Sequence, residues 1–191
     1  MRHNREINPH DCVPWTFLSD FAQVVMSFEA VETRNEGNCG RLRETACLIR
    51  KEYTSLAGPM DEICGAACPE CRDICCRRAT VWFDFQDLLY LYFGTCDFPE
   101  SQIRPKYDSD SGKSCCFFSE NGCTLKRHAR PFVCTWYVCP SQKHYITSCH
   151  TDLEEIIFSG LATIKKLKNE LESEFLNIII AGLRPGPMQA S

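Results

Sequence analysis

The residues TDLEEIIFSGLATIKKLKNELESEFLNIII (151–180) decide the fold class, because they carry the longest helical pattern in the chain. Thr151 and Glu154 have the spacing of a capping box, which predicts that a helix begins here. One apolar face follows at helical spacing, formed by Leu153, Ile157, Leu161, Ile164, Leu171, Phe175 and Ile178. The pattern predicts one long helix that ends at GLRPGP (182–187).

This apolar face, within residues 153–178, has two interpretations. A helix of this kind usually buries its apolar face on its own chain, here on the N-terminal helices. Ile157, Ile164, Leu171 and Ile178 also recur every seven residues, which is typical of a helix that pairs with a second copy. Lys168 interrupts the alternate positions of that seam. The pattern therefore favours packing within the chain, with a homodimer through the C-terminal helix as the alternative.

Two N-terminal segments also have helical spacing. A first helix is predicted to stop near NEGN (35–38) and has its apolar face at Phe17, Phe21, Val24, Phe28 and Val31. A second helix, expected to end at AGP (57–59), has its face at Leu42, Ala46, Ile49, Tyr53 and Leu56. Further on, Val81, Phe83 and Phe85 alternate as in a short strand, and DLLYLYFG (87–94) predicts a short helix. Residues 98–114 carry turn residues and predict a loop.

The predicted fold class is mainly α: a small helical domain with an irregular cysteine-rich metal-binding insert and a long C-terminal helix. We divide the chain into an N-terminal helical segment (1–60), a cysteine-rich metal-binding region (61–141) and the C-terminal helix (142–191). These parts are expected to form one structural domain, because the last helix would pack on the first ones. A chain of 191 residues is long enough to bury a core of its own.

Composition points to a cytoplasmic protein. The first residues, MRHNREINPHDCVPW (1–15), are charged and have no apolar centre, so they do not resemble a secretory signal. No apolar run is long enough to cross a bilayer, and a net charge of −4 gives no general attraction to nucleic acid or acidic membranes. We therefore expect neither a membrane nor a nucleic-acid partner. In a reducing compartment, dense cysteines favour metal or redox chemistry over disulfides, and an odd total of 15 excludes complete internal pairing.

Two dense groups of cysteines lie in the middle of the chain. CGAACPECRDICC (64–76) holds the first group, and the second comprises Cys115, Cys116, Cys123, Cys134 and Cys139. Both zinc sites and iron–sulfur clusters need four thiolates that converge from such groups. The all-cysteine ligand set, and the Pro140 that follows Cys139, slightly favour an iron–sulfur cluster over zinc.

These cysteine motifs resemble the bacterial and archaeal family of zinc- or iron-chelating cysteine-cluster proteins. The resemblance lies in CPECRDICC (68–76), CCFF (115–118) and GCTLKRHARPFVC (122–134). That family has CxxCxxxCC, later CxFL, then a cysteine and an Arg-Pro pair before a further cysteine. Phe118 replaces the leucine, and Cys116 is an additional thiol. A relative by this motif, the flagellin lysine methylase, carries a [4Fe-4S] cluster.

The resemblance implies metal ligands at Cys68, Cys71, Cys75, Cys76, Cys115, Cys123, Cys134 and Cys139. It leaves open whether these thiols form two four-ligand sites or one cluster with four further cysteines. Cys64 precedes the motif and is a candidate cofactor contact. Arg130 is a second one, expected at a helix start set by Pro131, where it would offset thiolate charge or alternatively form a surface ion pair. The outlying cysteines are expected to act as small buried hydrophobic residues: Cys12, Cys39, Cys47 and Cys96.

These observations predict a metal-binding protein with a [4Fe-4S] cluster, or Zn²⁺ as the alternative cofactor. The expected role is non-catalytic: an electron carrier, a sensor or a metal-handling protein with a redox or protein partner. The alternatives are an iron–sulfur-dependent transferase-type enzyme related to the flagellin lysine methylase, and a zinc-stabilised interaction module. Cys64-x3-Cys68-x2-Cys71 has the spacing of a radical S-adenosylmethionine motif, but Glu70 stands where that motif has an aromatic residue.

Overall fold

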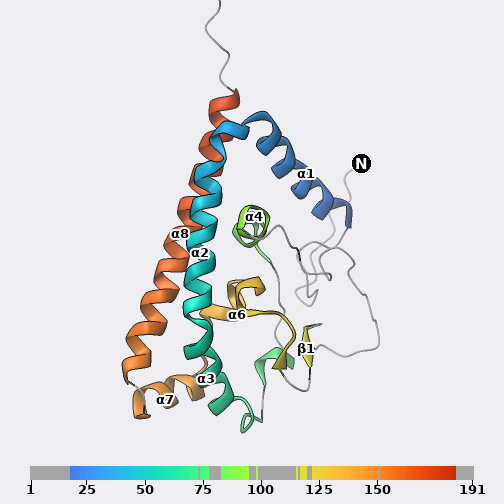
Figure 1. Ribbon diagram of the computed structural model, residues 1–191. Helices are drawn as coiled ribbons and strands as arrows, with labels where there is room; N and C mark the ends of the chain where they lie inside the picture. The colour runs from blue at the N-terminus through green and yellow to red at the C-terminus, as the bar shows by residue number, and fades with distance from the viewer. Residues whose placement is uncertain are drawn as a thin grey trace, which may run out of the picture.

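Two long helices, α2 (Gly40–Ser55) and α8 (Thr151–Leu183), lie side by side in this computed structural model (Figure 1). α4 (Phe85–Gly94) packs on both of them, and α1 (Leu18–Arg34) contacts α4. The structure describes residues 18–72, 74–77, 83–94, 98, 115, 117–119, 122–149 and 151–183. The predicted mainly α fold with a long C-terminal helix is confirmed, whereas the irregular cysteine-rich insert stays a prediction.

The remaining elements are shorter. α3 (Ala57–Ala67) follows α2 directly, and α7 (Pro140–Cys149) packs on α3 and α8. The cysteine-rich part contains η2 (Cys75–Arg77), β1 (Phe118–Ser119), β2 (Gly122–Cys123), η3 (Arg127–Ala129) and α6 (Val133–Trp136), and η1 (Glu36–Asn38) joins α1 to α2. β1 and β2 form one antiparallel pair. None of the helices in the described ranges combines the length and the hydropathy that a membrane span requires.

The apolar face of α8 is buried within the chain. All seven of its predicted face residues, from Leu153 to Ile178, are at most 8% exposed. The side of α2 that faces α8 is also buried. Its four apolar residues are fully buried: Leu42, Ala46, Ile49 and Tyr53. A large aliphatic side chain contributes roughly 1.5–3 kcal/mol on such burial, so this contact is the main part of the core. A homodimer through α8 stays a prediction.

An aromatic cluster attaches α1 to the other helices. The ring of Phe28 is fully buried and lies 5.4 Å from that of Phe175 in an edge-on arrangement. Tyr92 and Phe85 on α4 lie 5.3 and 5.7 Å from the same ring. α1 ends at Arg34, where the NEGN turn was predicted, while Phe17 lies outside the described residues. Phe28 therefore joins three helices at one point.

The prediction that the second helix ends at about AGP (57–59) is confirmed, but a new helix begins in the same residues. α2 stops at Ser55, but α3 begins at Ala57, and the amide of Met60 donates to the carbonyl of Leu56 at 3.0 Å. Pro59 is tolerated because it occupies the first turn of α3, where backbone N–H groups have no helical acceptor. The consequence is that Cys64 lies on a helix rather than in an irregular segment.

The predicted strand at residues 81–85 is wrong where the structure describes it. Phe83 has no regular structure and Phe85 begins α4, while Val81 lies outside the described residues. A reciprocal capping box explains the start: the amide of Asp87 donates to Asp84 Oδ1 at 2.7 Å, and the amide of Asp84 donates to Asp87 Oδ2 at 3.2 Å. The predicted loop at 98–114 lies outside the described residues except for Phe98.

The outlying cysteines differ from one another. Cys39 is fully buried, as predicted for a small hydrophobic residue, and burial raises the pKa of its thiol. Cys47 is exposed, so the same prediction is wrong for it. It follows Ala46 on α2 and therefore points about 100° away from the buried face. Cys12 and Cys96 lie outside the described residues.

Candidate metal centre

One cavity of about 630 Å³ lies among the cysteine-bearing segments, between α3, η2, the β1–β2 pair, α6 and the start of α7. Its walls include all eight predicted metal ligands together with Cys64 and Arg130. The nine cysteines that line it are Cys64, Cys68, Cys71, Cys75, Cys76, Cys115, Cys123, Cys134 and Cys139. These side chains, all within the described ranges, are thiols rather than disulfides. Cys116 lies outside those ranges.

The donor chemistry of this cavity fits a thiophilic metal, but the thiols do not converge on one point. In the described part of the chain, no group of three or more Cys, His, Asp or Glu side chains is arranged to hold a metal ion. Tetrahedral zinc and iron–sulfur clusters both require four thiolates at bonding distance from metal. The cavity therefore has the ligand type and number that such a metal needs, but the described side chains are not arranged to hold one.

The end of α3 positions the first thiols. Cys64 and Cys68 are one helical turn apart on the same face, and the amide of Cys68 donates to the carbonyl of Cys64 at 2.9 Å. Beyond the helix, the amide of Cys71 donates to the carbonyl of Cys68 at 3.1 Å. These hydrogen bonds keep the backbones of the three cysteines close together at the end of α3.

Gln142 is a site residue that the sequence analysis missed. Its side chain is 6% exposed, its Nε2 donates to Cys64 Sγ at 3.3 Å, and its Oε1 accepts from the amide of Cys139 at 3.0 Å. Cys139 immediately precedes α7 and Pro140 is its first residue, so Gln142 occupies the position from which a capping-box glutamine bonds back. The signal was therefore present in CPSQ (139–142), although its contact with Cys64 depends on the fold.

A backbone hydrogen bond and a hairpin position a second group of thiols. The amide of Cys115 donates to the carbonyl of Cys76 at 3.0 Å, which places these two residues next to each other. Phe118 pairs with Cys123 across the β1–β2 ladder. Gly122, the first residue of β2, has a φ of +95°, a conformation that favours glycine.

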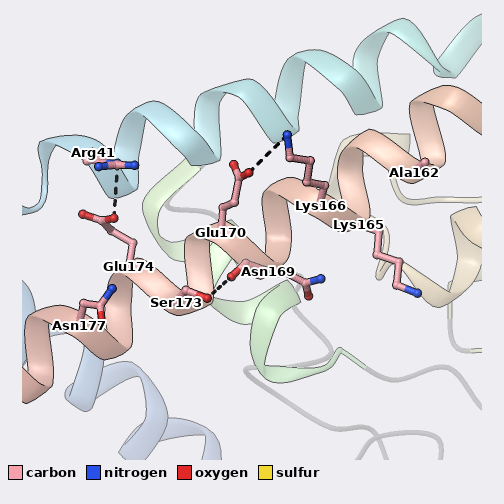
Figure 2. A pocket seen from close by; sticks show the side chains of 9 residues that line it. All are labelled: Arg41, Ala162, Lys165, Lys166, Asn169, Glu170, Ser173, Glu174 and Asn177. Atoms are coloured by element: carbon pink, nitrogen blue, oxygen red, sulfur yellow. Dashed lines mark hydrogen bonds and ion pairs between the residues drawn. The ribbon is translucent and has the colours of Figure 1, made fainter.

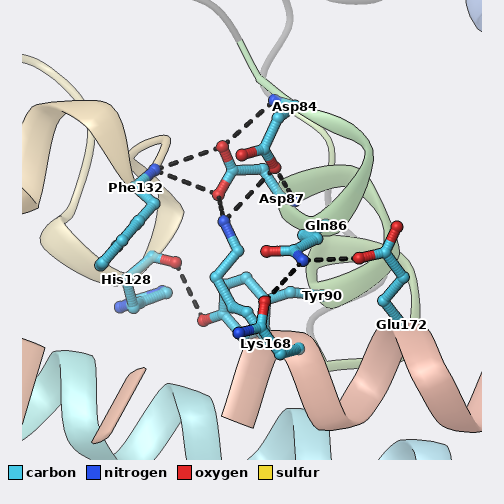
Figure 3. A network of polar contacts seen from close by, with 9 residues as sticks. Asp84, Gln86, Asp87, Tyr90, His128, Phe132, Lys168 and Glu172 are labelled. Atoms are coloured by element: carbon cyan, nitrogen blue, oxygen red, sulfur yellow. Dashed lines mark hydrogen bonds and ion pairs between the residues drawn. The ribbon is translucent and has the colours of Figure 1, made fainter. Parts of the chain in front are cut away.

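The segment that leads to Cys134 is held by side chains of α3 and α4, and Figure 3 shows the contacts of α4. Arg127 pairs with Asp61 of α3, and the Tyr90 hydroxyl of α4 donates to the carbonyl of His128 at 2.9 Å. The amide of Phe132, the N-cap of α6, donates to the two carboxylate oxygens of Asp87 at 3.1 and 3.2 Å. α6 then carries Cys134 into the cavity.

A buried ion pair holds the Asp87 carboxylate that bonds the amide of Phe132. Lys168, which interrupts the apolar seam of α8, is 1% exposed and its ammonium group contacts the carboxylate of Asp87 (Figure 3). The same ammonium lies 3.3 Å from Asp84 Oδ1 and 5.0 Å from the centre of the Phe132 ring. Burial raises the pKa of Asp87 to about 6, against the opposing effect of Lys168. The lysine in the seam thus connects α8 to α4 and to the segment of Cys134.

Burial keeps several cavity thiols protonated. It is the largest cause that raises the pKa of Cys68 to about 12, followed by the neighbouring Cys64, and likewise of Cys134 to about 12, followed by Cys123. The pKa of Cys76 is raised most by a hydrogen bond with Cys75 and next by burial. A metal must therefore displace protons from these thiols when it binds, so metal binding is expected to strengthen as pH rises.

Arg130 is a cation beside these thiols. It lines the cavity, is half-buried, and opposes the rise in the pKa of Cys134. Its Nε donates to the carbonyl of Leu125 at 2.9 Å. The predicted helix-start position is wrong, because Arg130 has an extended backbone at the end of η3 and α6 begins only at Val133. Extended geometry is the normal preference of a residue that precedes proline, here Pro131.

A second hollow of similar volume, about 610 Å³, lies on the surface between α2 and α8 (Figure 2). It is open to solvent, contains no cysteine, and is lined by charged side chains that pair with each other. Arg41 lies 3.4 Å from Glu174, and Lys166 lies 3.7 Å from Glu170. Exposed ion pairs of this kind contribute little, so the hollow offers no chemistry that compares with the thiol cavity.

The predicted site residues therefore come together in one place, with Gln142, Arg127 and Asp87 as additions from the structure. The outlying Cys39 and Cys47 lie away from the cavity walls. Comparison with known proteins yields no relative: no protein-family model, no curated protein and no solved structure matches this chain.

Proposed function

We propose that this chain is a metal-binding protein whose cysteine thiolates hold an iron–sulfur centre, with [4Fe-4S] as the expected type. The observation that carries the proposal is that nine cysteines from distant parts of the sequence line one cavity. Thiolates are the ligands of iron–sulfur clusters, and an apolar core alone has no need for so many of them. Zinc is the alternative metal, because four thiolates also satisfy it.

The neighbouring residues support the same chemistry. A set of metal-bound thiolates carries negative charge, which N–H donors and cations around it offset. Gln142 directs an amide N–H at Cys64 Sγ, and Arg130 lies close enough to Cys134 to oppose the rise in its pKa. A bound iron–sulfur cluster supplies one-electron transfer, and these side chains would orient its ligands and adjust its potential.

We assign a non-catalytic role in the cytoplasm: electron transfer, sensing or metal handling. Trp136 and Tyr137 line the cavity and are 51% and 48% exposed, so a redox or protein partner that docks there would approach the thiols closely. A reducing compartment suits such a number of thiols.

An iron–sulfur-dependent transferase-type enzyme is the second candidate. The cavity volume of about 630 Å³ favours it, because small-molecule sites commonly measure about 300–1,000 Å³. A small molecule that binds beside the metal and changes its spectrum would support this second candidate. A closed site that holds zinc would instead support a rigid interaction module.

The experiment that tests the proposal is a metal assay on protein purified without oxygen. Iron, zinc and acid-labile sulfide are measured on one sample, together with the visible absorption spectrum. We expect a brown protein with matching iron and sulfide, whereas colourless protein with stoichiometric zinc would select the alternative metal. Wild-type protein without bound metal would contradict the proposal.

Two serine variants complete the experiment. Cys71→Ser removes a thiol of the cavity and should lower the metal content per chain. Cys47→Ser is the matched control, because this thiol is exposed on α2 away from the cavity, and its metal content should equal that of the wild type. Full metal retention in Cys71→Ser would argue against the assignment of the cavity as the metal site.

A further inference from the structure

The wall of the thiol cavity carries a positive charge. Apart from its thiols, the described residues of the wall have charged groups only at Arg127 and Arg130. Arg127 is 5% exposed and its charge is balanced, because its guanidinium pairs with Asp61 of α3. Within the described part of the chain, no carboxylate is in ion-pair contact with Arg130. The charge of Arg130 is therefore the one in this wall that no described carboxylate balances.

Arg130 is held in place with most of its donors available to a ligand. Its side chain is half-buried and lines the cavity, and its Nε donates to the carbonyl of Leu125 at 2.9 Å. That bond uses one of the five N–H donors of the guanidinium, and the two Nη groups carry the other four. The effect of Arg130 on the pKa of Cys134 acts through space and uses none of these donors. A guanidinium fixed in this way offers a bidentate site to a planar anion.

The rest of the wall is largely apolar and partly aromatic. Its larger apolar side chains include Met60, Ile74, Phe117, Phe118, Leu125 and Val133. Trp136 and Tyr137 line the same cavity, are 51% and 48% exposed, and hold their rings edge-on with centres 6.0 Å apart. Aromatic side chains of this kind provide a contact surface for a flat apolar group. A volume of about 630 Å³ and an apolar wall with few polar groups are typical of sites for small molecules.

We propose that this cavity binds a small aromatic carboxylate. The carboxylate accepts hydrogen bonds from the Nη groups of Arg130, and the flat apolar part of the ligand contacts Trp136 and Tyr137. One unbalanced guanidinium matches one negative charge, which favours a carboxylate over a doubly charged phosphate. The inference rests on the proposed function for its use of this cavity and deepens it, because it names the class of small molecule that binds there.

Isothermal titration calorimetry of the full-length protein, purified without oxygen, tests the proposal with naphthoate as the probe. Naphthamide is the matched compound, since it has nearly the same shape and no charge. We expect saturable binding of naphthoate with a Kd of about 1 mM or below. Naphthamide should bind at least about 10-fold more weakly, because hydrogen bonds to charged groups are stronger than those to neutral ones. Equal affinity for the two compounds, or no saturable binding of naphthoate, would overturn the proposal.

Three variants assign the binding to the cavity. Arg130→Gln should weaken the affinity for naphthoate by roughly 10- to 100-fold and leave that for naphthamide unchanged. Arg41→Gln is the matched control and should bind as the wild type does, because Arg41 is 75% exposed and lines the charged hollow instead. Trp136→Leu should weaken the binding of both compounds by roughly 2- to 10-fold through loss of the aromatic contact. Unchanged naphthoate affinity in either Arg130→Gln or Trp136→Leu would contradict the proposed binding mode.

The comparison of naphthoate with naphthamide uses only the wild type, so it decides the question even if a variant loses its helical circular dichroism signal. Iron, zinc and sulfide are measured on the same samples, which separates two kinds of failure. Protein that holds metal but does not bind naphthoate would overturn this inference alone. Protein that binds naphthoate without holding metal would support the ligand class and contradict the proposed metal site.

Discussion

Replacement of Asp87 by alanine should destabilise this protein more than almost any other single change on α4. The carboxylate is buried, at 2% exposure for the residue, and it contacts the ammonium of Lys168, which is 1% exposed. It also accepts hydrogen bonds from the amides of Phe132 and Asp84. Alanine leaves an ammonium group and two amides without this acceptor in the interior. Removal of one partner from a buried ion pair costs about 3–5 kcal/mol, a large share of the about 5–15 kcal/mol by which proteins are stable.

Urea unfolding of the reduced protein, followed by circular dichroism, measures this loss. Glu170→Ala is the matched control. Like Asp87→Ala it removes the acidic partner of a lysine on α8, here Lys166, but both side chains of this pair are exposed. That control should change the free energy of unfolding by less than about 1 kcal/mol. The reasoning is refuted if Asp87→Ala costs no more than Glu170→Ala, since the pair would then contribute as little as a surface contact.

Two further predictions concern packing and pH. Gly160→Ala should destabilise the protein by about 1–3 kcal/mol, because a Cβ there would lie 2.7 Å from a methyl carbon of the buried Leu56. Gly182→Ala, on the same helix with open space around it, should instead be neutral or stabilising by up to about 1 kcal/mol, and equal effects would contradict the packing argument. Asp87 should make stability depend on pH, because its folded pKa of about 6 lies above the unfolded value of about 3.9. The folded state then binds this proton more tightly, so the contribution of Asp87 to stability falls as pH rises from about 4 to about 6. In melting experiments, the advantage of the wild type over Asp87→Asn should shrink across that range, and a constant difference would show that Asp87 does not titrate there.

Most helices of the fold were predictable, because the buried face of a helix in a globular protein is formed by apolar residues three or four positions apart in the sequence. The faces of α2 and α8 are examples: every apolar position that the spacing selected there, from Leu42 to Ile178, is buried. The errors arose where local signals compete. At Phe83–Phe85 an alternating pattern suggested a strand, but the capping box of Asp84 and Asp87 starts a helix. At residues 57–59 a proline correctly indicated a helix end, but the new helix α3 was not foreseen, because the first turn of a helix also accepts proline.

The candidate site was predictable in composition but not in arrangement. Cysteine spacing and the family resemblance selected eight residues, and all of them line one cavity. Gln142 was not selected, because CPSQ (139–142) indicates only a helix cap, whereas its contact with Cys64 joins α7 to α3 and depends on the fold. Lys168 appeared only as an interruption of the apolar seam, since its carboxylate partner lies on another helix.

The sequence by itself determined the helical class, the long C-terminal helix and the concentration of thiols, because helical periodicity and residue chemistry are local properties of the chain. Only the tertiary structure decided which thiols face one cavity, that Gln142 bonds Cys64, and that Asp87 contacts both Lys168 and the amide of Phe132 before Cys134. The physical reason is that such contacts join residues far apart in the sequence, and their distances depend on how the helices pack rather than on the spacing of residues along the chain.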